Sequence, residues 1–211
     1  MTPLLAALAV IVIAWFAAGS VWNVRKGSAA MRWMQEGLPA IGERTTVRWL
    51  GTTAIELGLR APRAPFEAVT IIVFLEPRDV PWMWALGRRQ GRRDTLIVRA
   101  RLLAAPASDL DVIDRASWSG REVLGRLDRA WSVREPASEG GLATFYPAPP
   151  ALARADALLA LAGGAGVEVR RLSVRRGERR LELHVALPPP AASARRFFEA
   201  VRALGERAVA A

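Results

Sequence analysis

The sequence predicts an α+β fold in which one N-terminal transmembrane helix precedes a mixed or mainly antiparallel sheet with helices on one face. The first 22 residues carry no charged side chain. Between residues 45 and 103, alternating and β-branched apolar runs indicate strands. The C-terminal half follows the order of a β-α-β-β-α unit, whose helices cover one side of its sheet. We therefore expect a transmembrane anchor (1–24), a juxtamembrane segment (25–41) and a basic cytosolic domain (42–211).

The uncharged run from Met1 to Trp22 has the length of a membrane anchor, because about 20 helical residues cross a hydrocarbon core of roughly 30 Å. Arg25 and Lys26 follow it, and basic residues beside a spanning helix stay on the cytoplasmic side. This predicts a single-pass protein of the cell membrane with its N-terminus outside and its C-terminal domain in the cytoplasm. The alternative is a secreted protein, since residues 17–19 are small, as before a signal cleavage site. The run lacks a positive n-region and exceeds the usual h-region, which favours the uncleaved anchor.

The segment behind the anchor predicts a helix and then a strand. Residues 28–38 continue the anchor as a short juxtamembrane helix, with Trp33 and Met34 near the lipid headgroups. From 45 to 59, apolar residues alternate with polar ones. This pattern predicts one long, half-buried strand that bends at Gly51.

The middle of the chain predicts two clear strands and one weak region. Residues 67–75 are apolar on both faces, as expected for the central strand of the sheet, and 95–103 form the next strand. Between 109 and 137 the pattern is weak and fits either a short helix or irregular strands. Residues 142–146 form a short strand. The Gly and Pro cluster at 136–141 is the candidate boundary if the domain divides into two subdomains.

The last 60 residues are the clearest part of the pattern. Strong helix formers occupy 151–162, and strands are expected at 167–174 and 181–187. The phase of the first strand shifts at Arg170 and Arg171, which predicts a β-bulge. The final helix has one apolar stripe, which consists of Ala194, Phe197, Phe198, Val201, Leu204 and Ala208.

Composition narrows the chemistry. The chain has no cysteine and a single histidine, His184, so thiolate metal sites and a cysteine nucleophile are excluded. The net charge is +10, and Lys26 is the only lysine among 30 basic residues. Such a surface suits anionic lipid or phosphate backbones, although solvated and paired arginines explain it equally well.

The segment from 78 to 93 combines two tryptophans with several arginines in what the sequence predicts to be a loop. Tryptophan favours the membrane interface, and arginine is attracted to lipid phosphates. The sequence thus predicts a second membrane contact, while the alternative is that both tryptophans cap the core. The predicted lipid-contact residues are Trp82, Met83, Trp84, Arg88, Arg89, Arg92 and Arg93.

Other candidate sites are weaker. Asp109, Asp111 and Asp114 lack the turn glycine and closing glutamate of a calcium loop, so capping or solvated roles are expected. His184 shares a strand face with Glu182, and an ion pair or an exposed hydrogen bond explains it. We expect no catalytic, metal or cofactor site with a linear motif.

The sequence resembles no family closely enough to name one. It predicts a membrane-anchored domain that serves binding or scaffolding, with lipid and a protein as the expected partners. One alternative is a tethered nucleic-acid-binding module. It requires one continuous basic face that joins the loop arginines to Arg170, Arg171, Arg175, Arg176, Arg179 and Arg180. The other alternative is an enzyme whose site has no linear motif, for which a pocket with at least two convergent carboxylates or an Arg–carboxylate pair would be the sign.

Overall fold

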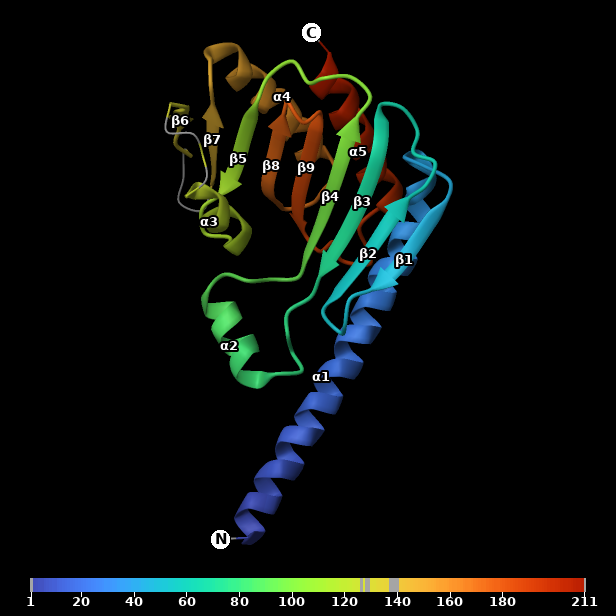
Figure 1. Ribbon diagram of the computed structural model, residues 1–211, viewed down its shortest axis with the longest axis vertical. Coiled ribbons are helices and arrows are strands. Elements are labelled where there is room, and N and C mark those ends of the chain that lie inside the picture. Colours follow the sequence, from blue (N-terminus) through green and yellow to red (C-terminus); the bar gives the residue numbers. More distant parts are fainter. Residues whose placement is uncertain (1, 126, 128–129, 137–140, 211) are drawn as a thin grey trace.

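The computed structural model describes residues 2–125, 127, 130–136 and 141–210. Within them, one antiparallel sheet has the strand order β1-β2-β3-β4-β9-β8-β5-β7-β6 (Figure 1). The predicted α+β class is confirmed. In chain order the elements are α1 (Thr2–Gly37), the 3₁₀ turn η1 (Leu38–Ala40), β1 (Thr45–Trp49), β2 (Ala54–Leu59), β3 (Phe66–Phe74), α2 (Pro81–Arg89), β4 (Thr95–Leu102), β5 (Leu110–Asp114), α3 (Trp118–Leu124), β6 (Ser132–Arg134), β7 (Leu142–Tyr146), α4 (Pro149–Gly164), β8 (Val169–Arg175), β9 (Arg180–Ala186) and α5 (Ala194–Val209).

Helix α1 is long and apolar enough to span a membrane, with a mean hydropathy of 2.5 over a window that is 6% buried. Its N-terminal half extends away from the sheet, and its C-terminal half packs against the domain (Figure 1). The placement of Trp33 and Met34 near lipid headgroups is wrong, because both are buried in the core. The Trp33 ring lies 5.6 Å from that of Phe197 and 6.0 Å from that of Phe198, which fixes α1 to α5.

The single long strand predicted over 45–59 is instead a hairpin of β1 and β2. Gly51 has φ +76°, and the backbone N–H of Leu50 donates to the carbonyl of Ala54 at 2.9 Å, so the chain reverses there. Alternation persists through a tight hairpin, and periodicity alone therefore cannot separate a bend from a turn. The strand predicted as central, β3, is interior, but β9 occupies the middle of the sheet.

The main core lies between one face of the sheet and the helices α4, α5 and the C-terminal half of α1 (Figure 1). The predicted apolar stripe of α5 is confirmed, since all six of its residues are buried. The pairing of β8 with β9 shifts register between Val169 and Arg171, as the predicted bulge requires. Burial of the α5 stripe removes its apolar area from water and so stabilises this half of the fold.

The other face of the sheet is partly covered at its β5–β7 end. There Ile113, Ala143 and Phe145 form a small cluster with Val123 and Trp131, from α3 and the segment behind it. The weak region of the sequence thus contains a fully buried strand, β5, and a short helix. The candidate subdomain boundary falls mostly on residues 137–140, outside the described part, and β6 and β7 on either side of it belong to the same sheet.

Candidate functional site

Helix α1 meets the domain along a stripe of small residues that includes Gly19, Gly27 and Gly37. These positions lie near one side of a helix that turns about 100° per residue. A Cβ atom on Gly19 would come within 2.4 Å of the Arg78 carbonyl oxygen, and one on Gly37 within 2.4 Å of the Ala194 carbonyl oxygen. Glycine therefore lets α1 approach the backbone of the domain at both ends of the contact.

Asp94 joins α1 to the segments on both sides of α2. Its carboxylate accepts hydrogen bonds from both terminal nitrogens of Arg78, at 2.9 and 2.7 Å, and from the backbone N–H of Glu76 at 2.8 Å. Lys26 of α1 donates to the same carboxylate. Asn23, fully buried on α1, donates to the Glu76 carbonyl at 3.1 Å and accepts from Arg78 at 3.2 Å. Residues from three distant parts of the sequence thus form one polar network.

The charge balance of this network keeps Asp94 ionised. Burial alone would raise the pKa of the Asp94 carboxyl, but hydrogen bonds from Arg78 and Lys26 outweigh it and hold the pKa below its ordinary value. The side chain of Asp94 is 8% exposed and that of Arg78 is 16% exposed. A buried pair of this kind is costly to break, because removal of one partner leaves a desolvated charge.

Helix α2 is fastened to α1 through Trp84. The Trp84 indole N–H donates to the buried Glu76 carboxylate at 2.6 Å, and its ring lies 6.4 Å from that of Trp15 on α1. The indole N–H of Trp15 donates to the Arg78 carbonyl at 2.9 Å. The Arg88 guanidinium lies 5.4 Å from the centre of the Trp84 ring. Trp84 is therefore an inward-facing residue of the α1–α2 contact.

The predicted lipid-contact segment is a helix and not a loop over Pro81–Arg89, since a proline at its start fits the first helical turn. It separates the predicted residues into two groups. Trp82 and Met83 are 65% and 49% exposed, and Leu86 of the same helix is 58% exposed. The helix begins at its end farthest from the sheet and runs back toward it (Figure 1). The arginines follow at its C-terminal end, as Arg88, Arg89, Arg92 and Arg93.

A second polar cluster lies on the sheet face that α4 and α5 leave uncovered. Asp111, 0% exposed, pairs with Arg171 at 3.4 Å and with Arg175. Glu182 pairs with Arg171 at 3.4 Å and lies 2.6 Å from Nε2 of His184. The solvated role expected of Asp111 is wrong, and the hydrogen bond expected of His184 exists but is buried.

The two ends of the Glu182–His184 hydrogen bond have shifted pKa values. Burial opposes ionisation of Glu182, but the hydrogen bond from His184 and the charges of Arg99 and Arg171 lower its pKa to about 2. Burial, together with those same arginines, lowers the pKa of His184 against the opposing effect of Glu182. At neutral pH Glu182 is therefore a carboxylate and His184 a neutral imidazole that donates through Nε2.

The other aspartates of the sequence analysis have structural partners. Asp114 pairs with Arg170 at 2.8 Å and accepts from the Ala116 backbone N–H at 2.9 Å. Asp109 accepts from the Arg176 backbone N–H at 2.7 Å. In the described part of the chain, no three His, Asp or Glu side chains lie together as metal ligands would.

Several arginines of β8, β9 and the turn between them are paired with carboxylates. Arg171 and Arg175 pair with Asp111, as described above. Arg179 lies 3.1 Å from Glu67, and Arg180 lies 3.1 Å from Glu178. These pairings reduce the free positive charge on this part of the surface, and the continuous basic face that the nucleic-acid alternative requires stays a prediction.

A cavity of about 50 Å³ lies where His184, Arg170 and Trp118 come together. It is far smaller than the roughly 300 Å³ needed to enclose an ordinary organic substrate. The Ser117 hydroxyl on its wall already donates to the Asp114 carbonyl at 2.7 Å and accepts from the Gly120 N–H at 3.0 Å. The arrangement suits the binding of a small group better than nucleophilic chemistry by this serine.

The chain matches no protein-family model, and none of the curated proteins is significantly similar to it. Its site must therefore be understood from geometry. Sequence reasoning missed the α1 stripe and the Asp94 network. The recurrence of Gly19, Asn23, Gly27 and Ala30 at intervals of three or four residues was the available signal for the stripe. Asp94 carried no such signal, because its partners are distant in the sequence.

Proposed function

We propose that this protein is a single-pass membrane protein whose basic domain is held in a fixed orientation against the cytoplasmic leaflet and acts there as a binding or scaffolding module. The observation that carries the proposal is the position of α2. This helix exposes Trp82, Met83 and Leu86 while a neighbouring tryptophan fastens it to the apolar helix α1.

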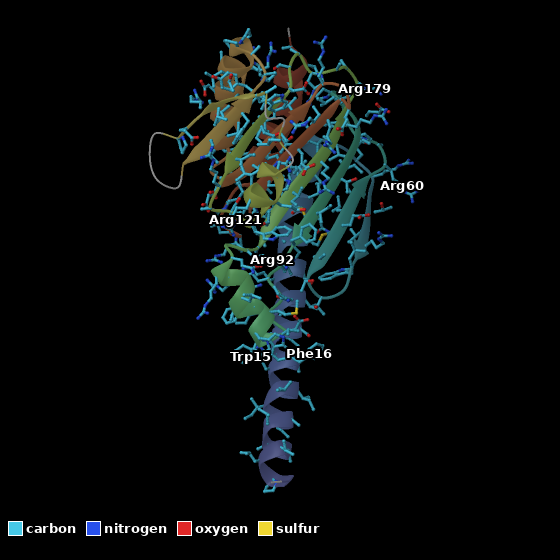
Figure 2. The ribbon with its side chains drawn as sticks, turned by 60° about the vertical axis from the view of Figure 1, so that its left-hand side comes forward. Trp15, Phe16, Arg60, Arg92, Arg121 and Arg179 are labelled. Atoms are coloured by element: carbon cyan, nitrogen blue, oxygen red, sulfur yellow. The ribbon has the colours of Figure 1, made fainter. Side chains whose placement is uncertain are left out.

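The depth of α2 supports a membrane contact. Trp15 lies beside the end of α2 that is farthest from the sheet (Figure 2). Trp15 comes twelve positions after Pro3, a rise of about 18 Å, which is less than a hydrocarbon core of roughly 30 Å. If α1 spans a bilayer from Pro3, the first turn of α2 lies in the hydrocarbon of the inner leaflet, where lipid chains would remove its exposed apolar side chains from water.

The arrangement of charge along α2 also supports a membrane contact. Its arginines follow the apolar residues and lie closer to the domain, as they must if the apolar end enters the lipid and the basic end stays at the headgroups. Each basic residue near an anionic surface contributes about 1 kcal/mol of attraction. A groove of about 430 Å³ between α1 and α2 adds apolar surface beside Trp15 and Trp22. This area suits lipid chains.

The test measures the depth of a single label in the full chain. The chain has no cysteine, so Met83→Cys and Val133→Cys each provide one labelling site, and Val133 is 42% exposed on β6, far from α2. With spin labels in vesicles of anionic lipid, we expect position 83 to be relaxed by oxygen in the membrane. Position 133 should be relaxed by a water-soluble nickel complex. An aqueous profile at 83 equal to that at 133 would refute the contact.

Orientation is tested with the same variants. A membrane-impermeant maleimide added to intact cells should leave Val133→Cys unlabelled, and label it once the cells are opened. Labelling from outside would place the domain on the other side. A mature N-terminus near Ser20 would mean that α1 is a cleaved signal, contrary to the proposal.

A further inference from the structure

The small cavity beside His184 has an unusual lining of charge. It lies between the segment that follows α2, the start of α3 and the near ends of β3 and β4. Arg92, one of its residues, lies between α2 and the sheet, close to Arg121 (Figure 2). Its lining includes Arg92, Arg93, Arg170, His184 and Trp118.

Two of the three arginines bring positive charge that nearby carboxylates do not balance. Arg170 is paired with Asp114 at 2.8 Å and with Glu168 at 3.0 Å. Among the described residues, by contrast, no carboxylate lies within ion-pair distance of Arg92 or Arg93. Arg93 donates to two backbone carbonyls, and the Arg92 guanidinium lies 5.2 Å from the Trp118 ring centre. This part of the lining therefore has an excess of cationic hydrogen-bond donors.

His184 adds a buried acceptor. The residue is 5% exposed, and its Nε2–H is used by Glu182. Its Nδ1 atom is buried and has no hydrogen-bond partner among the described residues. In the neutral imidazole this nitrogen carries a lone pair and needs a donor. Because His184 lines the cavity, a ligand there that reaches Nδ1 would have to offer it a proton, and the arginines would attract negative charge on the same ligand.

We infer that this cavity binds a phosphate group that retains a proton, either free phosphate or the monoester headgroup of a lipid such as phosphatidic acid. The anionic oxygens face Arg92 and Arg93, and the remaining P–OH donates to Nδ1 of His184. Sulfate has the same tetrahedral shape and the charge of the phosphate dianion but carries no proton near neutral pH, so it leaves Nδ1 unpaired. The cavity volume of about 50 Å³ admits such a group but not a larger substrate.

The first test needs no substitution. Titration calorimetry of the detergent-solubilised full chain compares inorganic phosphate with sulfate at pH 6. Both populated forms of phosphate carry a proton there. Because the site rejects a ligand that leaves a buried polar group unpaired, we expect phosphate to bind roughly tenfold more tightly or better. Equal affinities, or no phosphate binding, overturn the inference.

The second test removes the excess charge. In the variant Arg92→Gln with Arg93→Gln, the loss of charge-assisted hydrogen bonds should weaken phosphate binding roughly tenfold or more. Arg89→Gln with Arg88→Gln removes the same charge from α2 outside the cavity lining and should have about a twofold effect at most. Equal losses in the two variants would mean a diffuse charge effect and would overturn the site.

The source of the phosphate is resolved with vesicles. The full chain is reconstituted in neutral lipid that contains either phosphatidic acid or an equal charge of phosphatidylglycerol, a phosphodiester without an available proton. A higher melting temperature only with phosphatidic acid identifies the lipid, provided that the Arg92 and Arg93 variant abolishes it. Phosphate binding without this lipid effect identifies the free ion. The lipid arm rests on the proposed membrane contact, whereas the calorimetry does not, so the two proposals can fail separately.

Discussion

Asp94→Asn tests whether the polar network fixes α1 to the domain. The substitution keeps the size of the side chain but removes its charge, and it exchanges one acceptor oxygen for a donor that faces Arg78 and Lys26. Since the Asp94 and Arg78 side chains are 8% and 16% exposed, this is a buried pair, and breaking it costs about 3–5 kcal/mol. Lys26 is 41% exposed and adds at most about 1 kcal/mol. Arg78 keeps a second carboxylate, Glu76, at 3.6 Å, so we expect a loss near 3 kcal/mol.

The assay is urea unfolding of the full chain in detergent, followed by tryptophan fluorescence. The matched control is Asp156→Asn, since Asp156 is 50% exposed and pairs with Arg134, itself 41% exposed. A surface pair of this kind contributes about 1 kcal/mol or less. If the Asp94 and Asp156 variants lose the same free energy of unfolding, the network does not hold the junction, and the reasoning from burial fails.

Three further predictions concern single sites. Trp84→Phe leaves the Glu76 carboxylate without its indole donor and should lower the free energy of unfolding by about 1–3 kcal/mol. Its control is Trp82→Ala, at a 65% exposed residue. This variant should change the free energy of unfolding in detergent little, but it should weaken the binding to vesicles. Gly19→Leu should separate α1 from the domain and cost about 1–3 kcal/mol by urea unfolding, because its Cβ meets a backbone carbonyl at 2.4 Å. Folding lowers the pKa values of both Glu182 and His184, so the stability that depends on them is complete above pH 6.5. The His184 part declines as the pH falls below 6.5. The Glu182 part is lost between pH 4.5 and about 2. Unfolding curves from pH 8 to 3 measure this, and His184→Gln should remove the upper part of the decline.

The elements that could be predicted are those whose local pattern coincides with their packing. Helix α5 has a single apolar stripe that is buried along its full length, and β8 shows its bulge as a phase shift between Val169 and Leu172. Both signals depend on neighbours within a few residues, which is what periodicity records. The hairpin at Gly51 could not be predicted, because a glycine within an alternating apolar pattern fits a bent strand as well as a tight turn.

The site could be predicted only in part. Trp82 and Met83 stand out because large apolar side chains beside arginines are conspicuous in any sequence. Asp94 does not, since its partners come from residues 23–26 and 76–78 and only the fold brings them together. Asp111 likewise looks like a loop residue until β5 is seen in the sheet. Long-range ion pairs leave no periodic trace in a sequence.

If α1 spans a membrane, as we propose, its continuity has a mechanical consequence. Proline is absent between Leu4 and Gly37, and the polar network and the tryptophan pair hold the helix on the domain at two levels. A change in the tilt of its apolar half must therefore move the whole domain, including α2. Because tilt adjusts a helix to the thickness of the bilayer, the depth of α2 and the bilayer thickness are coupled in such an arrangement. A loosened junction, as in the Asp94 variant, should make the label at position 83 respond less to lipid chain length than it does in the parent protein.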